Sequence, residues 1–189
     1  MSDHEETLLE SHGLFVAPTD ASDAMHPALV ILWSLEEPAR VGEVALISQT
    51  GRYVLGRGGR SSVDSGEHPL VFAQHRTSAP PPTGIEGRRI SRRQLIVERG
   101  PRARIEVENV GRCPLLINGV ETKTATLRHG DVLHLDRQLV LRVSERPRRV
   151  EADLADLEKQ VPFGRADEGG QVGETPALWE LRRRLRFAA

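Results

Sequence analysis

Arginine is the side chain of this sequence best suited to bind a ligand, and it is concentrated in one segment. The stretch GRRISRRQLIVE (87–98) places four arginines around Ser91, namely Arg88, Arg89, Arg92 and Arg93. Like charges this close repel one another unless an anion or nearby carboxylates compensate them. The alternative to an anion site is that Arg88, Arg89 and Arg93 only solvate a surface loop or pair with neighbouring glutamates, which are Glu86, Glu98 and Glu108.

Other chemistry is weakly represented. The glycine-rich stretch GRGGRSS (56–62) lacks the terminal Lys-Ser or Lys-Thr of a nucleotide-binding loop, and no helical pattern follows it. No serine lies in a Gly-x-Ser-x-Gly turn, and no paired carboxylates lie in an apolar segment. The seven histidines are scattered, and Cys113 is the single cysteine. We therefore expect no enzyme activity, no metal, no cofactor and no internal disulfide.

Composition describes one domain with tails rather than two domains. The chain has 189 residues and a net charge of −1, so any basic site must be local. Lysine occurs only at 123 and 159, which leaves 24 of the 26 basic residues as arginine; a GC-rich genome explains this bias as well as selection for anion binding does. The acidic N-terminus has no signal-peptide pattern, and no apolar run reaches the roughly 18 residues of a membrane span. We expect a cytoplasmic protein without membrane contact.

Short apolar runs separated by turn residues predict that most of the chain is β-structure. Ile105 and Val107 alternate with Glu106 and Glu108, as in a half-buried strand. No helical period occurs between 28 and 144, so about nine to eleven strands predict an all-β sandwich or barrel. The expected strands cover 28–35, 43–48, 52–56, 69–74, 93–98, 103–109, 113–119, 131–135 and 138–143.

Three segments break this pattern. We expect residues 1–28 to form a polar tail. Residues 75–88 contain three consecutive prolines, which predict a long surface loop. After residue 144 the apolar spacing becomes helical, and Thr175 with Pro176 predicts the start of a second helix. We expect that helix to be poorly anchored, because its apolar stripe has no evident partner; the stripe consists of Leu178, Leu181 and Leu185.

Four motifs in a fixed order resemble the forkhead-associated (FHA) domain. They are YVLGRG (53–58), RRISRRQLIVE (88–98), IEVENVGRCPLLINGV (105–120) and LRHGDVLHLDRQLVLRV (127–143). The resemblance covers residues 29–144 and implies an all-β, FHA-type β-sandwich of about eleven strands, here with a C-terminal helical extension. In that family, loops at one end of the sandwich bind phosphothreonine peptides.

The resemblance also implies a binding site. It assigns phosphate contact to Arg57 and Ser91. Arg92, next to Ser91, and Arg60 or Arg112 on neighbouring loops could add contacts. Phosphothreonine carries about −1.5 to −2 charge and three strong acceptors, which a guanidinium and a hydroxyl suit. The remaining implied peptide-binding positions are Cys113, which aligns with the asparagine that holds the peptide backbone, and Asn118 of the Asn-Gly motif.

The sequence departs from the family pattern at three points. Gln94 replaces the histidine that braces the binding loops, and Cys113 lacks the amide of asparagine. Arg57 and Ser91 are also 34 positions apart, which is longer than the family usually requires. These departures leave open an alternative function, a degenerate FHA scaffold for phosphate-independent protein contact or self-association.

The C-terminal phrase QVGETPALWELRRRLRFAA (171–189) resembles the opening of the AAA+ domain of sigma-54-dependent transcriptional activators. With it the chain divides into a polar tail (1–28), an FHA domain (29–144), a helical linker (145–170) and a truncated AAA+ start (171–189). This implies the sensory part of a bacterial regulator that responds to Ser/Thr phosphorylation. ATP, sigma-54 RNA polymerase and DNA would be partners only of domains absent from this chain, and the missing nucleotide loop argues against an enzyme or ATP-driven machine.

Overall fold

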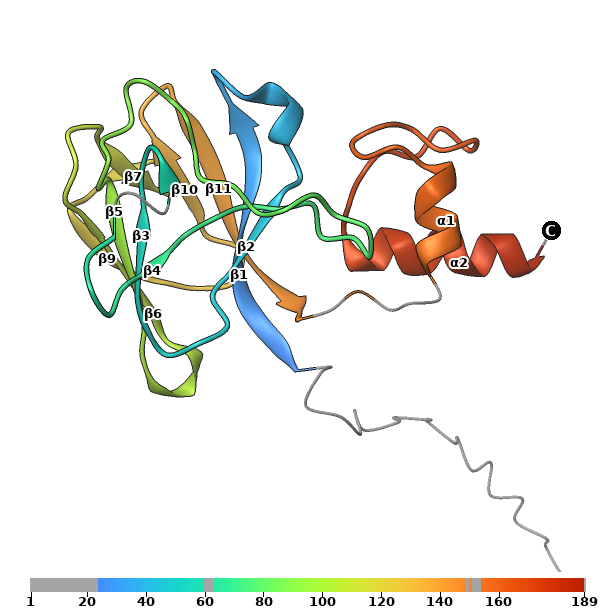
Figure 1. The fold of residues 1–189 in the computed structure, drawn as a ribbon, viewed down its shortest axis with the longest axis horizontal. Helices are drawn as coiled ribbons and strands as arrows, with labels where there is room; N and C mark the ends of the chain where they lie inside the picture. The colour runs from blue at the N-terminus through green and yellow to red at the C-terminus, as the bar shows by residue number, and fades with distance from the viewer. Residues whose placement is uncertain (1–23, 60–62, 149, 151–153, 189) are drawn as a thin grey trace, which may run out of the picture.

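Two β-sheets packed face to face form the main body of the protein. The computed structural model describes residues 24–59, 63–148, 150 and 154–188 (Figure 1). Within these residues, eleven strands form a six-stranded and a five-stranded sheet, and two helices follow them. The predicted all-β sandwich of about eleven strands with a C-terminal helical extension is therefore confirmed.

The six-stranded sheet is antiparallel throughout, in the order β2-β1-β11-β10-β7-β8. Its longest pairing joins β1 to β11, from Met25 opposite Pro147 to Ser34 opposite Leu139. The strands are β1 (Met25–Ser34), β2 (Val44–Leu46), β7 (Leu115–Ile117), β8 (Val120–Glu121), β10 (Val132–Leu135) and β11 (Leu139–Pro147).

The five-stranded sheet has the order β4-β3-β5-β6-β9, with only β3 and β4 parallel. Leu55 pairs with Leu95, and Leu95 pairs with Asn109, so the loops after β3, before β5 and after β6 meet at one end. The strands are β3 (Gly51–Leu55), β4 (His68–Pro69), β5 (Leu95–Arg99), β6 (Ile105–Asn109) and β9 (Thr124–Leu127).

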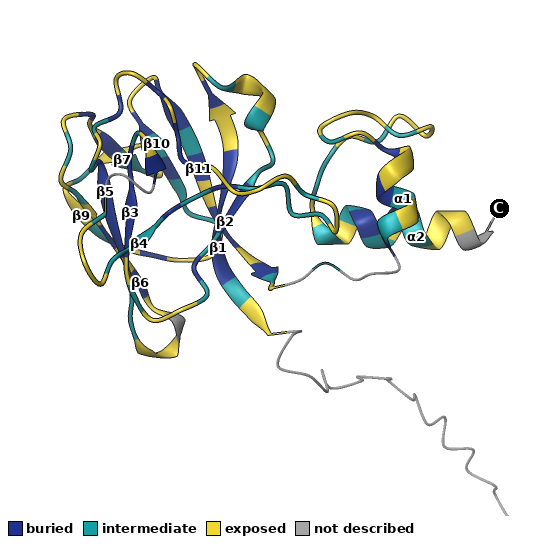
Figure 2. Cartoon of the chain, viewed as in Figure 1, coloured by how far each residue is buried: buried dark blue, intermediate teal, exposed yellow. Residues whose placement is uncertain are grey.

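One apolar core lies between the sheets. Inward-facing side chains from both sheets are fully buried, among them Leu29, Leu95, Val97, Leu133 and Leu139. Figure 2 shows the buried segments along the strands and the exposed ones mainly in the loops. Each such side chain contributes about 1.5–3 kcal/mol relative to an exposed one, so this core holds the loops at the sandwich end in place.

Some element bounds differ from the sequence predictions. Strands β8 and β9 were not expected. Strand β8 has only two residues, and Thr124 and its neighbours give β9 little apolar alternation. The run 69–74 forms only the end of β4, followed by single bridges at Phe72 and Ala73. Strand β1 begins at Met25, inside the predicted tail, and residues 1–23 of that tail lie outside the described residues. Two short 3₁₀ helices complete the sandwich, η1 (Pro38–Arg40) and η3 (Pro101–Ala103).

The predicted proline-rich loop has no strand, but it is not entirely on the surface. Phe72 and Thr83 exchange backbone hydrogen bonds of 2.8 and 2.9 Å, which close residues 73–82 into a two-armed projection that we call the finger. The finger extends from the sandwich to the C-terminal helices (Figure 1). Gly84 and Ile85, just after it, are buried because Ile85 joins the core.

The C-terminal helices, α1 (Ala155–Gln160) and α2 (Pro176–Ala188), form a helical unit, which we define as residues 154–188. The expectation of a poorly anchored α2 is wrong. Trp179 is buried with Leu154 and Val161, because α2 turns this face inward instead of its leucine stripe. Leu181 and Leu185 remain 43% and 51% exposed. No helix in the described part of the chain is long and apolar enough to cross a membrane.

Candidate functional site

Three loops meet at the end of the sandwich where β3 and β6 finish and β5 begins. The Arg57 amide donates to the Ser91 carbonyl at 3.0 Å, and the Ser91 hydroxyl accepts from the Arg112 amide at 3.1 Å. The structure therefore brings Arg57, Ser91 and Arg112 together, as the sequence predicts. A phosphate receptor would require this convergence of separate loops.

Gln94 connects these loops from inside the protein and is fully buried. Its Oε1 accepts from the amides of Ser91 at 3.1 Å and Cys113 at 3.4 Å. Its Nε2 donates to Asn109 Oδ1 at 2.7 Å and to the Cys113 carbonyl at 2.8 Å. Gln94 thus provides the bracing that the resemblance assigns to a histidine, with all four contacts made by one amide.

Two glycines permit the close packing of these loops. A Cβ on Gly111 would lie 2.4 Å from Gln94 Oε1, and a Cβ on Gly56 would lie 1.8 Å from the Arg92 carbonyl oxygen. Both distances are far below van der Waals contact, so neither position accepts a side chain without rearrangement. Gly56 therefore lets the end of β3 approach the Ser91 loop, and Gly111 leaves room for the Gln94 amide.

Several arginines surround Ser91 and reach solvent. Arg92 and Arg112 are exposed, and Arg57 is half-buried. Arg88 and Arg89 are exposed in a turn that the Ile90 amide closes by donating to the Gly87 carbonyl at 3.0 Å. Ile90 is buried in the core and holds this turn in place. The end of the sandwich around Ser91 therefore presents positive charge to solvent.

Arg93 differs from these arginines because it pairs with carboxylates. Its guanidinium lies 2.6 Å from Glu67 and 3.2 Å from Asp64. The hydrogen bond from Arg93, helped by the Asp64 amide, lowers the pKa of Glu67 to about 2. The alternative of carboxylate pairing is therefore correct for Arg93, although its partners differ from those that sequence proximity suggests. Arg93 fixes the segment before β4 against the start of β5.

Cys113 takes part in this network through its backbone rather than its thiol. The Sγ donates to the Asp136 carbonyl at 3.6 Å, and the residue belongs to the buried core. Burial, and then the charge of Asp136, raises the pKa of the Cys113 thiol. The Cys113 side chain, at the position that the resemblance aligns with a peptide-holding asparagine, thus makes its contact inside the protein.

Asn118 does not belong to the cluster around Ser91, which corrects the sequence expectation. It forms the turn between β7 and β8, with a positive φ of 50°. Its side-chain Nδ2 donates to Asp131 Oδ1, and its Oδ1 accepts from the Val132 backbone amide, each at 2.9 Å. Asn118 follows the end of β7 that lies away from Cys113, and its hydrogen bonds shape this turn. Arg60, also predicted near the site, lies outside the described residues.

Sequence reasoning missed two residues that order the site loops. Asn109 donates its side-chain amide to the Cys113 carbonyl at 2.9 Å and accepts from Gln94. Arg40 donates to the carbonyls of Gly84 at 2.6 Å and Thr83 at 3.1 Å. The sequence marks both residues. Asn109 ends an alternating strand, and Arg40 has a glutamate three residues away on each side, with which it pairs at 2.8 Å.

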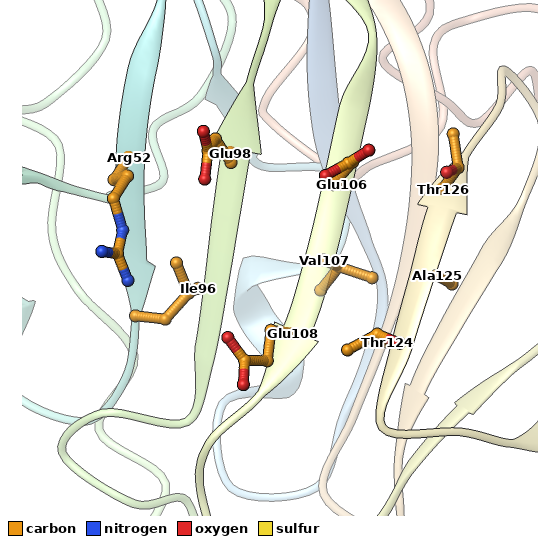
Figure 3. Close-up of a pocket in the computed structure, with 9 residues that line it drawn as sticks. All are labelled: Arg52, Ile96, Glu98, Glu106, Val107, Glu108, Thr124, Ala125 and Thr126. Atoms are coloured by element: carbon orange, nitrogen blue, oxygen red, sulfur yellow. The ribbon is translucent and has the colours of Figure 1, made fainter.

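A shallow hollow of about 480 Å³ lies on the outer face of the five-stranded sheet. Figure 3 shows Glu98, Glu106 and Glu108 on adjacent strands of this face, with Arg52 beside them. Glu98 and Glu106 are directly paired in register, so the face is acidic and would not bind phosphate. No cluster of three metal-ligating side chains occurs in the described part of the chain.

Comparison with known proteins gives similarities of fold only. No family profile and no curated protein matches the sequence. An FHA domain solved in a study of phosphothreonine-dependent interactions is 15% identical, with 65% of this chain and 98% of that one covered and a TM-score of 0.42. The FHA domain of protein CT664 from Chlamydia trachomatis is 13% identical, with 63% of this chain and 96% of that one covered and a TM-score of 0.46. The FHA domain of an Arabidopsis thaliana hypothetical protein is 16% identical, with 68% of this chain and 92% of that one covered and a TM-score of 0.44. TM-scores below 0.5 do not decide what this chain binds.

Proposed function

We propose that this chain is a regulatory module that binds phosphothreonine peptides. The observation that carries the proposal is the convergence of Arg57, Ser91 and Arg112 at one end of the sandwich, braced by the buried amide of Gln94. A guanidinium fork and a hydroxyl on adjoining rigid loops suit a dianion with three strong acceptor oxygens.

The hydrogen bonds around Ser91 suit this task. Because the Ser91 oxygen already accepts from the Arg112 amide, its hydroxyl proton remains available to donate to a phosphate oxygen. Arg57 would supply the charge-assisted fork. The exposed guanidinium groups of Arg88, Arg89 and Arg92 raise the local positive potential, which accelerates the association of an anionic peptide and makes it sensitive to salt.

The proposal extends to a biological setting, the sensory part of a bacterial sigma-54-dependent regulator that couples Ser/Thr phosphorylation to transcription. Its support is the phrase at 171–189, within which Thr175 accepts from the Leu178 amide at 3.2 Å and starts α2. ATP, sigma-54 RNA polymerase and DNA would be partners of other domains of such a regulator. The module itself would act by binding, without catalysis, in the cytoplasm.

One observation favours a second candidate, a degenerate scaffold for phosphate-independent contact or self-association. The buried Cys113 thiol offers no amide to hold a peptide backbone. In that case a partner would bind equally well with and without phosphate.

Titration with matched phosphorylated and unphosphorylated threonine peptides tests the proposal. We expect phosphate-dependent binding that Arg57→Ala weakens about tenfold to a hundredfold, because a hydrogen bond to a charged group contributes roughly 1.5–3 kcal/mol. Arg128→Ala is the matched control, since Arg128 is exposed beyond β9 at the other end of the sandwich. Equal binding of both peptides would refute the proposal in favour of the scaffold.

A further inference from the structure

Arg76 lies in the finger, and the described partners of its buried guanidinium lie in the helical unit. Its guanidinium pairs with Glu174 at 2.8 Å, and each of the two side chains is only 7% exposed. Its Nη1 also donates to the Val161 carbonyl at 2.7 Å and the Glu158 carbonyl at 3.3 Å. The finger residue next to Arg76 adds a contact of its own, since the Thr77 amide donates to Glu158 Oε2 at 2.9 Å.

Aromatic side chains of the helical unit enclose the same guanidinium. The Arg76 Cζ lies 5.3 Å from the ring centre of Phe163 and 4.9 Å from that of Trp179. Such cation–π contacts gain strength when water is excluded. The contact between the finger and the helical unit therefore uses the charge of the guanidinium, its fork of hydrogen-bond donors and its flat faces.

The helical unit also approaches the sandwich at Gly42, where an added Cβ would lie 3.3 Å from Phe163 Cζ, but its apolar packing is limited. The buried apolar cluster of the unit contains only Leu154, Val161 and Trp179, with two partly buried neighbours. Removal of one partner from a buried ion pair is strongly destabilising, because the other charge remains buried without compensation. Loss of the Arg76 side chain should therefore release the unit from the finger.

The base of the finger adjoins the candidate phosphate site. A Cβ on Gly84 would lie 2.4 Å from the Cα of Gly59, so the two backbones are in direct contact. The Gly58 amide, next to Arg57, donates to the Ile85 carbonyl at 3.0 Å. The residues that immediately follow the finger therefore contact the Arg57 loop on one side, while the Ser91 loop contacts it on the other.

The finger is stiff enough to link its two contacts. Pro80, Pro81 and Pro82 lie between Arg76 and Gly84, and each has its φ fixed by the ring. Proline-rich segments act as semi-rigid spacers rather than flexible coils. The two arms are also tied together by the paired backbone bonds of Phe72 and Thr83. A displacement at the tip would therefore be carried toward the base.

We infer that Arg76 is a positioning residue for the phosphate site. The docked helical unit holds the finger through Arg76, and the base of the finger holds the loop that presents Arg57. The inference rests on the proposed function for its ligand. Because coupling between two sites is reciprocal, a bound phosphopeptide would also stabilise the docked helical unit.

The test uses Arg76→Ala and Glu174→Gln, which break the same contact from opposite sides. Both should weaken binding of a phosphothreonine peptide by about 2- to 30-fold, the usual range for residues that act through a packed network. The double variant should be no weaker than either single variant. Arg165→Ala is the matched control, since it removes the same charge from an exposed position of the helical unit and should leave affinity unchanged. Arg76→Lys keeps the charge but not the fork and should bind with intermediate affinity.

A second readout needs no ligand. Hydrogen exchange of the Gly58 amide should accelerate in Arg76→Ala and in Glu174→Gln, together with exchange of the α2 amides. If α2 is released while Gly58 exchange and peptide affinity both stay at wild-type values, the inference is wrong. If the wild type binds no phosphopeptide but Gly58 responds, the proposed function fails and the positioning role stands. If Arg76→Ala does not fold, Glu174→Gln decides the matter, because it leaves the finger intact.

Discussion

Replacement of Gln94 by methionine would remove the braces of the site loops while keeping a side chain of similar length and volume. Gln94 is fully buried and uses its amide on the backbones of Ser91 and Cys113 and on the side chain of Asn109. Methionine fills the same space but neither donates nor accepts these bonds. The substitution therefore isolates the hydrogen bonds from the packing.

The expected loss of stability follows from which partners are left unsatisfied. The Cys113 amide is buried and would lose its acceptor, which costs about 1–3 kcal/mol. The Ser91 amide is half-buried, so water can reach it and the cost is about 1 kcal/mol. The Cys113 carbonyl and Asn109 Oδ1 keep other donors, at 2.9 and 3.3 Å, and add little. The free energy of unfolding should fall by about 2–4 kcal/mol.

Urea denaturation measures this change, with a lower midpoint and an unchanged slope as the expected result. Gln138→Met is the matched control. Gln138 is also buried, but its amide donates only to the neighbouring Arg137 carbonyl, and its Oε1 has no hydrogen-bond partner. The control should lose about 1 kcal/mol or less. If Gln94→Met is no less stable than Gln138→Met, and hydrogen exchange at the Ser91 amide is unchanged, Gln94 does not brace the loops.

Three further predictions concern the surroundings of the site. The pKa of Glu67 is lowered to about 2, so its ion pair stabilises the protein above the ordinary pKa of 4.5 and is lost as the pH falls toward 2; acid unfolding of Arg93→Ala should lack this component. Gly56→Ala should lower the thermal unfolding temperature and abolish peptide binding, because the new Cβ meets the Arg92 carbonyl, and a normal melting curve would contradict this. Since burial raises the pKa of the Cys113 thiol, iodoacetamide at pH 8 should label Cys113 slowly in the folded protein and rapidly in urea; equal rates would show that the thiol is accessible.

The sandwich and the convergence of its loops could be predicted from local patterns. Alternation such as Ile105 and Val107 against Glu106 and Glu108 marks a strand without knowledge of its partners. Arg57 and Ser91 adjoin β3 and β5, which pair in register, so their meeting follows once the sandwich is assumed. The short strand β9 was missed because threonine and alanine give it no clear apolar face.

The contacts that complete the site depend on residues far apart in the sequence. Arg76 and Glu174 are separated by 98 positions, and nothing in their local sequences marks them as a pair. Trp179 rather than the leucine stripe anchors α2, and its ring contacts Arg76 of the finger as well as Arg182 of its own helix. Such choices depend on tertiary packing, which sequence spacing alone does not contain.

The pairing of the first and last strands determines where other proteins can be attached. Strands β1 and β11 run side by side from Ser34 and Leu139, near the site loops, to Met25 and Pro147 at the opposite end. The chain therefore enters and leaves the sandwich at adjacent points, roughly 5 Å apart as in any antiparallel pair. A fluorescent protein or affinity tag fused before Met25 would stand at the end remote from Ser91. The module could thus be immobilised on a surface with its arginine-rich loops directed toward the solution.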